Sequence, residues 1–388
     1  MRFKQLTKYI PFALLLLLSC KQKGQSKNNL AATAAGSVLN EPDFTFKPLS
    51  DQEKARLHDE AEAAYHKILG PSFNGAIIVA KNGVVVFEDY KGYVNLKNKT
   101  PITASTPFHL ASVSKTFTGT TVMKLWEQGR LSLEDSLQKY FPALPYHGIT
   151  VRMLLDHRSG LPNYLYFLDT GWNKKVKASN EDVLNYMITK KPKVYNAPNR
   201  GFHYCNTNYV LLAMIIEKIT GINYPQYMKD SVFTPLGMKN TFVFSAKDTL
   251  NYVPTYIGNT PYAMDHLDCT YGDKNVYSTA QDMFLWDKAL YENTFVSAAT
   301  LATALQPESN ERKSMHNYGL GWRLFINGKD TIVYHNGKWH GTNTAFTRLV
   351  QDTATIIVLG NKYNRNIYSS KKIASIFTGK TDDVKLEE

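Results

Sequence analysis

The rest of the chain is organised around residues 108–118, which read FHLASVSKTFT. Lys115 follows Ser112 by three places, and apolar side chains continue to Gln128 at mostly helical spacing, so we expect a helix to begin near Ser112. Positions i and i+3 share one face of a helix, which brings the Lys115 amine beside the Ser112 hydroxyl. Free backbone N–H groups at a helix start also favour developing negative charge. Ser112 is therefore well placed to act as a nucleophile.

The Ser-x-x-Lys pattern is short, and the chain contains it again at Ser136/Lys139 and Ser369/Lys372. In the simplest alternative, Ser112 only caps a helix and Lys115 is solvated. A choice between the two interpretations depends on the motifs that accompany the pattern elsewhere in the chain.

Composition places the chain among ordinary globular proteins. It has 388 residues, of which 43% are hydrophobic and 20% charged, enough for one large or two moderate domains. The formal net charge is +12, but the lysines are scattered rather than clustered, so we expect no nucleic-acid partner. Attraction to anionic envelope surfaces explains the charge more simply, and a basic envelope-binding protein is a reading that rests on this charge alone.

The N-terminus resembles that of a bacterial lipoprotein. Basic residues precede an apolar run, residues 10–18, that is too short to span a bilayer. The run ends in LLSC at residues 17–20, which resembles a lipobox. This implies a signal peptide over residues 1–19 and a lipid on Cys20 that anchors the protein to a membrane, facing the periplasm or the cell exterior. A plain secretory signal with a chance cysteine is the alternative.

The remaining cysteines, Cys205 and Cys269, do not indicate a disulfide framework, because nothing in the sequence places them within bonding distance. Cysteine, histidine and carboxylate residues show no metal-ligand spacing. We therefore expect neither a metal nor a cofactor.

Residues 20–48 are small and polar and read as a tether, which leaves a single domain over residues 49–388. An apolar helix over residues 210–220 ends at Gly221, within a mainly helical region from 112 to about 235. The other expected elements are a helix over 51–68, a β-hairpin of 75–80 and 84–87 around Asn82-Gly83, strands over 321–326, 331–334, 344–350 and 355–359, and a final helix over 369–377.

Strands near both chain ends around a helical middle predict an α/β (α+β) fold. One antiparallel sheet is built from both chain ends and flanked by helices, and a mainly helical lobe is inserted. The sheet lobe comprises about 49–105 and 270–388, and the helical lobe about 106–269. A functional site is expected in the cleft between them.

Two further motifs join Ser112-x-x-Lys115. Tyr204-x-Asn206 is weak alone, since the spacing recurs at residues 93/95 and 291/293, and His335-Asn336-Gly337 ends a predicted strand. In this order, with spacings of 92 and 131 residues between Ser112, Tyr204 and His335, the three motifs resemble those of the penicillin-recognising serine hydrolases.

Longer segments extend the resemblance over roughly residues 50–375. They are GRLSLED at 129–135, LLDHRSGLP at 154–162, PLGM at 235–238 and YSTAQDM at 277–283. The chain looks closest to the class C β-lactamase, D-peptidase and esterase branch. The resemblance implies a β-lactamase/transpeptidase-like fold and a serine hydrolase that acts on small esters, D-amino-acid peptides or amides, or β-lactams.

The family's mechanism maps onto particular residues. Ser112 forms an acyl-enzyme, and Lys115 and Tyr204 handle its proton, with Tyr204 favoured as the base and the division of labour open. Asn206 orients Lys115 and contacts the substrate amide.

The resemblance also implies roles for the residues around His335-Asn336-Gly337. The backbone N–H groups of Ser112 and Lys338 form the oxyanion hole, and Gly337 lets the substrate approach closely. His335 stands where most β-lactamases have lysine, and Asn336 where threonine or serine is usual. Because a histidine is mostly neutral near pH 7, we expect weak grip on a substrate carboxylate and a preference for esters or uncharged D-amino-acid amides.

A recognition or sensor protein of the penicillin-binding type, with little or no turnover, is the main alternative function. The presence of Ser112, Lys115, Tyr204 and Asn206 argues against it, because a protein without turnover has no chemical need for all of them.

Overall fold

The computed structural model describes residues 39–245, 252–328 and 330–379. The expected signal peptide, the expected lipidation site Cys20 and most of the expected tether lie outside these residues. Within the described ranges, no helix combines the length and apolar character needed to cross a membrane.

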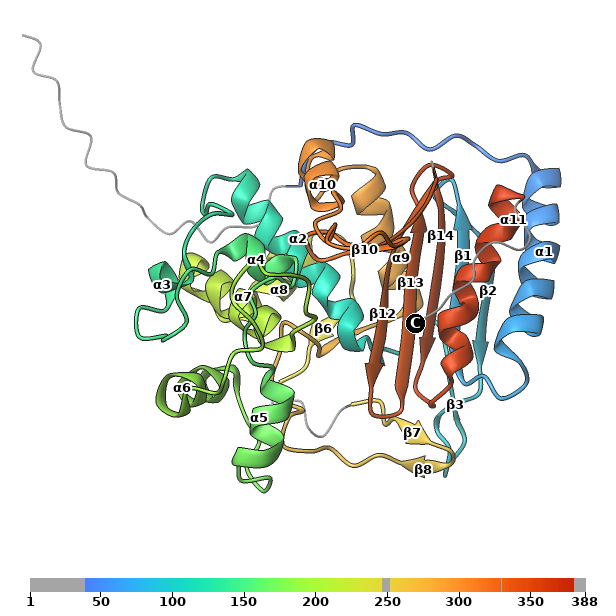
Figure 1. The fold of residues 1–388 in the computed structure, drawn as a ribbon. Coiled ribbons are helices and arrows are strands. Elements are labelled where there is room, and N and C mark those ends of the chain that lie inside the picture. Colours follow the sequence, from blue (N-terminus) through green and yellow to red (C-terminus); the bar gives the residue numbers. More distant parts are fainter. Residues whose placement is uncertain (1–38, 246–251, 329, 380–388) are drawn as a thin grey trace, which may run out of the picture. The chain divides into compact units, whose positions relative to one another are not determined.

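A seven-stranded antiparallel sheet is built from both ends of the chain, as the sequence predicts (Figure 1). Its first hairpin consists of β1 (Gly75–Lys81) and β2 (Val84–Lys91), joined by Asn82-Gly83 with φ of 49° and 69°. β1 pairs with the last strand, β14 (Ala354–Gly360). The strand order is β10-β11-β12-β13-β14-β1-β2, with β10 (His316–Tyr318), β11 (Arg323–Asn327), β12 (Asp330–Trp339) and β13 (Thr342–Leu349).

The sheet is covered on both faces because successive side chains alternate between two cores. Ile77 and Val79 belong to the core beneath the first and last helices, whereas Ile78 and Ala80 belong to the larger core shared with the helical lobe. These strands read as continuous apolar runs, since neither face meets water.

Helix α1 (Asp51–Leu69) and the C-terminal helical segment together cover the face of the sheet that bears Ile77 and Val79 (Figure 1). The predicted final helix over 369–377 is present but begins earlier: residues Arg365–Ala374 form a 3₁₀ helix (η4), followed by the short α11 (Ser375–Thr378). Ile367, Ser370 and Ile373 are all buried, and this spacing of three matches the three residues per turn of a 3₁₀ helix.

The helical lobe surrounds α2 (Ser114–Glu127), which is buried over almost its whole length. The predicted apolar helix is α7 (Asn206–Thr220), and Gly221 closes it in the left-handed conformation. The other helices are α3 (Leu137–Tyr140), α4 (Val151–Leu155), α5 (Tyr164–Gly171), α6 (Asn180–Lys190), α8 (Tyr224–Met228), the π-helical turn η2 (Lys229–Phe233), α9 (Ala280–Tyr291) and α10 (Ala298–Ala304).

The described residues also form three small sheets. The one that matters for the site places β9 (Val276–Ser278) between β5 (Phe108–His109) and β6 (Phe242–Val243). The other two pair β3 (Tyr93–Asn95) with β4 (Thr100–Pro101), and β7 (Tyr256–Ile257) with β8 (Thr260–Pro261).

The described end of the expected tether, residues 39–48, has no helix or strand but contacts the domain. The Asn40 N–H donates to the Thr294 carbonyl (2.7 Å), and the Asp43 N–H to the Glu292 carbonyl (3.2 Å). These residues therefore lie along the end of α9.

Candidate active site

Ser112 lies in a tight turn just before α2. Residues Ala111–Val113 form a 3₁₀ turn (η1) and α2 begins at Ser114, two residues later than expected. Ala111 has a φ of 48°, an unusual value for a residue with a side chain. Such a conformation persists only where its surroundings hold it in place.

Backbone and side-chain hydrogen bonds hold this turn. The Leu110 N–H donates to the Val276 carbonyl (2.8 Å), and the Ala111 N–H to Nδ1 of His109 (3.1 Å). The Val276 N–H donates to the Ser114 hydroxyl (3.0 Å). The nucleophile turn is thus fixed to strand β9, 162 residues from Ser114 in sequence.

Lys115 is fully buried, so the alternative of a solvated lysine is wrong. Its Nζ donates to the Ser112 hydroxyl (3.1 Å), the Asn206 Oδ1 (2.8 Å) and the Asp273 carbonyl (2.7 Å). An ammonium group has three N–H donors, and here each finds one acceptor. The structure therefore brings Ser112, Lys115 and Asn206 together, and adds the Asp273 carbonyl, which no sequence motif indicated.

Tyr204 lies just before α7, so that a single chain segment supplies both Tyr204 and Asn206. The Lys115 Nζ is 5.0 Å from the centroid of the Tyr204 ring, and the Arg323 Cζ is 5.2 Å from it. The ring of His157 packs on that of Tyr204, with 4.2 Å between centroids. Two cations therefore lie close to the Tyr204 ring.

Arg323 is a component of the site that the sequence interpretation missed. Its buried Nε has no hydrogen-bond partner among the described residues, and its side chain hydrogen-bonds to Tyr334, the residue opposite it on β12, rather than to a carboxylate. A charged residue within the otherwise apolar strand expected over 321–326 was the available signal, because an isolated charge inside a strand core is costly.

His335 is fully buried rather than open to a substrate. Its Nδ1 lies 2.8 Å from the Asn336 carbonyl and donates to it, so Nε2 accepts from the Tyr318 hydroxyl at 3.2 Å. Burial, and then the charges of Arg323 and Lys115, hold the pKa of His335 well below its usual value. The ring is therefore neutral at physiological pH, and its role in substrate binding stays a prediction.

Gly337 is needed for packing against the nucleophile turn. A Cβ at this position would lie 2.2 Å from the Thr344 Oγ1 and 2.4 Å from the Leu110 carbonyl oxygen. The Thr344 hydroxyl donates to that same carbonyl (2.8 Å). Glycine therefore lets η1 lie against β12, which is a different role from the expected close approach of a substrate.

Lys338 has an exposed side chain, with its Nζ 5.8 Å from the centroid of the Tyr363 ring. Strand β11 pairs only with residues 330–334 of β12, so in the described chain residues 335–339 have no strand partner on that side. This leaves a backbone edge beside the nucleophile turn. The expected oxyanion donors, the N–H groups of Ser112 and Lys338, therefore belong to neighbouring segments.

Two other groups near the site are structural. His157 accepts the Cys205 N–H on Nδ1 (3.1 Å), and burial followed by the Lys115 charge holds its pKa well below the usual value. Cys205 and Cys269 are both free. Burial raises the pKa of Cys205 to about 11, so it is a thiol rather than a reactive thiolate at neutral pH.

Comparisons with known proteins agree with this geometry. The Bacillus subtilis (strain 168) penicillin-binding protein 4* is 34% identical over 334 residues, which cover 80% of this chain and 74% of that protein. The octameric penicillin-binding protein homologue from Pyrococcus abyssi superimposes with a TM-score of 0.72 at 25% identity, over 87% of this chain and 79% of that one.

A third similar structure is the D-amino acid amidase from Ochrobactrum anthropi SV3 in complex with D-phenylalanine. Its TM-score is 0.68 at 21% identity, over 83% of this chain and 99% of that one, which shows a shared fold. The model of the Beta-lactamase family matches residues 66–373. The chain therefore belongs to the Beta-lactamase family, whose fold and motif order it shares.

Proposed function

We propose that the protein hydrolyses ester or amide bonds through an acyl-enzyme on Ser112. The observation that carries this proposal is the Lys115 ammonium, which is buried and donates to Ser112, Asn206 and the Asp273 carbonyl at once. Burial penalises the charged form of a lysine, and the three hydrogen bonds offset that penalty while they hold the amine against the Ser112 hydroxyl. Membership of the Beta-lactamase family supports the same class of chemistry.

In the proposed mechanism, Tyr204 rather than Lys115 takes the proton of the nucleophile. All three N–H groups of Lys115 already donate, so Lys115 acts as a cation that orients Ser112. Tyr204, acting as the general base, accepts the Ser112 proton while the Oγ–C bond forms at the substrate carbonyl. The proton then passes to the leaving group as its bond breaks, and water releases the acyl group by the reverse sequence.

Charge is stabilised at two places during this reaction. The backbone N–H groups of Ser112 and Lys338 hold the carbonyl oxygen as it becomes negative. The cations of Lys115 and Arg323, which lie 5.0 and 5.2 Å from the centroid of the Tyr204 ring, stabilise negative charge on that side chain.

The preferred substrates are small esters and D-amino-acid amides or peptides rather than β-lactams. The strand position that would supply a permanent cation for a carboxylate holds the neutral, buried His335. A D-amino acid amidase with the same fold has a structure in complex with D-phenylalanine, which supports amino-acid amides as a substrate class to test here.

Steady-state kinetics on one substrate of each class tests the proposal: a p-nitrophenyl ester, a D-amino-acid p-nitroanilide and a chromogenic cephalosporin. We expect turnover of the first two and weak or absent turnover of the third, all lost in Ser112→Ala. Ser136→Ala is the matched control, because it removes an exposed serine from the same short pattern. Stoichiometric acylation without turnover would instead assign a recognition protein, and faster cephalosporin hydrolysis would contradict the substrate preference.

We also propose that the mature protein begins at a lipidated Cys20 and is anchored to a membrane. The LLSC sequence at residues 17–20 supports this. Fractionation of cells that express the wild type and Cys20→Ala tests it: the wild type is expected with the membranes, and the variant as a released protein or an unprocessed precursor. A wild type that is soluble and cut at another position would refute the anchor.

A further inference from the structure

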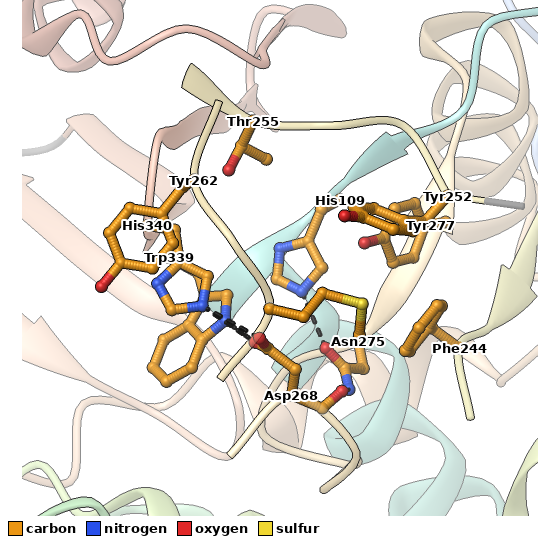
Figure 2. Close-up of a pocket in the computed structure, with 11 residues that line it drawn as sticks. His109, Phe244, Tyr252, Thr255, Tyr262, Asp268, Asn275, Tyr277, Trp339 and His340 are labelled. Atoms are coloured by element: carbon orange, nitrogen blue, oxygen red, sulfur yellow. Dashed lines mark hydrogen bonds and ion pairs between the residues drawn. The ribbon is translucent and has the colours of Figure 1, made fainter. Parts of the chain in front are cut away.

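A pocket with aromatic walls lies beside the nucleophile turn (Figure 2). The residues that matter for its chemistry are His109, Tyr262, Asp268, Asn275, Trp339 and His340. They come from β5, from the segments before β9 and after β8, and from the end of β12, so the fold assembles the pocket from distant parts of the chain.

Short connections link this pocket to the candidate active site. His109 precedes Ser112 by three residues, which span at most about 10 Å even when fully extended. Its Nδ1 accepts the Ala111 N–H (3.1 Å), so Nε2 carries the hydrogen and donates to the Asn275 Oδ1 (2.8 Å). Burial lowers the pKa of His109 to about 4, and the ring is a neutral part of the wall at physiological pH.

Trp339 and Asn275, which also line the pocket, are near neighbours in sequence of residues of the candidate active site. Trp339 directly follows Lys338, whose N–H group is an expected oxyanion donor. Asn275 lies two residues beyond Asp273, whose carbonyl accepts from Lys115. The pocket is therefore connected to the candidate active site through direct chain neighbours on β5, on β12 and on the segment before β9.

Two carboxylates, Asp268 and Asp265, lie at the pocket, and their ion pairs in the described chain are with His340. The buried Lys274 interacts with both carboxylates at longer range. Asp268 is 6% exposed, and its Oδ1 accepts from the indole N–H of Trp339 (2.6 Å) and from Nε2 of His340 (2.9 Å). Asp265 lies 3.8 Å from the same His340 nitrogen.

The nearby lysines have other partners. Lys274 is paired with Asp273 (3.8 Å) and lies over the Trp339 ring, and Lys177 donates to the backbone carbonyl of Asp265. Two carboxylates thus share a single imidazole.

We propose that this pocket binds the ammonium group of the substrate's acyl part, such as the free α-amino group of a D-amino-acid amide or ester. Aromatic faces attract organic cations, and the attraction is strongest where water is excluded. Trp339 and Tyr262 provide such faces, and Tyr262 is held by stacking on His340 with 4.0 Å between ring centroids. The Asp268 carboxylate supplies the opposite charge. This inference rests on the proposed function of Ser112.

A metal ion is the competing occupant. Asp265, Asp268 and His340 each offer a ligand atom within 4.8 Å of the others. However, the His340 Nε2 lies at hydrogen-bond distance from Asp268, in the position where a metal would have to replace the hydrogen. An organic cation needs no such displacement, which favours the ammonium ligand.

Selectivity between two matched substrates tests the proposal. In the full-length protein, kcat/KM is measured for D-phenylalanine p-nitroanilide and for its N-acetyl derivative, which lacks the positive charge. We expect the wild type to prefer the free amine and Asp268→Asn to reduce this preference by about ten- to a hundredfold, mainly through KM. Asp169→Asn is the matched control, because Asp169 is a surface carboxylate paired only with Lys174 and should keep the wild-type ratio.

If Asp268→Asn does not fold, or if the protein turns over neither substrate, a second variant and a direct binding measurement still test the proposal. Tyr262→Leu removes a partly exposed aromatic face and should reduce the same ratio by about threefold. Calorimetry on Ser112→Ala should show binding of D-phenylalanine amide and weaker binding of its N-acetyl derivative, whether or not the enzyme turns over.

Several results would overturn the inference. Equal treatment of both substrates by the wild type, or an unchanged ratio in a folded Asp268→Asn, removes the ammonium site while leaving Ser112 chemistry intact. Tight Zn²⁺ binding that Asp268→Asn abolishes assigns a metal site instead. Loss of the proposed function shows itself separately, as a failure of Ser112 to be acylated by either substrate.

Discussion

Two copies of the same four-residue pattern behave differently in this molecule. In Ser112-x-x-Lys115 the lysine is fully buried and donates to the serine hydroxyl. In Ser136-x-x-Lys139 the lysine side chain is 56% exposed and donates to Asp135 (2.8 Å) rather than to Ser136. The local spacing is identical, so the spacing alone does not produce a nucleophile.

Long-range packing makes the difference between the two pairs. Lys115 takes acceptors from positions 91 and 158 residues away, Asn206 and the Asp273 carbonyl. Lys139 finds its acceptor four residues away on a surface helix. The comparison teaches that reactivity depends on the segments that surround a motif, because they decide whether its lysine is buried and whether its hydrogen bonds point at the serine.

The largest effect is expected when the two lysines are removed separately. Lys115→Ala should reduce kcat/KM for the preferred ester by about a hundred- to ten-thousandfold, because Ser112 loses the cation that orients it. Lys139→Ala should leave kcat/KM unchanged, since exposed ion pairs contribute little. Equal losses in both variants would mean that burial does not distinguish the two pairs.

A second experiment disturbs the close packing of β12 against the nucleophile turn, a contact that the Ser136/Lys139 pair lacks. Gly337→Ala places a methyl group against the Leu110 carbonyl, and should reduce kcat/KM by about a hundredfold because the nucleophile turn is displaced. Gly129→Ala is the control: Gly129 has a φ of 67° and open space around it. The control should lose about 1–2 kcal/mol of stability from the left-handed conformation but retain kcat/KM. Full activity in Gly337→Ala would show that the turn does not depend on this contact.

The smallest effect concerns the pH dependence of stability. The pKa of His335 is lowered on folding, so its stabilising contribution is complete above the unfolded value of 6.5 and is lost as the pH falls below it. In that range, each drop of one pH unit lowers the free energy of unfolding by about 1.4 kcal/mol for such a group. Urea unfolding between pH 7 and 5 should therefore show a shallower decline for His335→Gln than for the wild type.

His147→Gln is the matched control for this titration, because His147 is exposed, and its decline should parallel that of the wild type. A wild-type slope in His335→Gln would show that the buried ring does not resist protonation.

Much of the fold follows from local sequence signals. The Asn82-Gly83 turn between apolar runs predicted the first hairpin, and Gly221 predicted the end of α7. Successive side chains of the continuously buried strand β1 belong alternately to two cores, which confirms that one sheet separates them. The terminal helix was predicted without its type, because a short apolar pattern does not distinguish the observed 3₁₀ helix from an α-helix.

The candidate site was less predictable because its contacts are long-range. The motifs identified Ser112, Lys115 and Asn206, which the structure brings together. They did not indicate the Asp273 carbonyl, since a backbone acceptor leaves no trace in residue identity. Nor did they indicate that His335 is buried, or that Gly337 accommodates the Leu110 carbonyl, because both depend on how strand β12 meets the nucleophile turn.

Covalent labelling tests the central claim most directly. The wild type, Ser112→Ala and Ser136→Ala are treated with a serine-reactive fluorophosphonate, followed by intact-mass analysis and peptide mapping. We predict one added group per molecule at Ser112 in the wild type and in Ser136→Ala, and none in a folded Ser112→Ala. Labelling of Ser136, Ser114 or Ser369 in place of Ser112, or undiminished labelling of Ser112→Ala, would contradict the account.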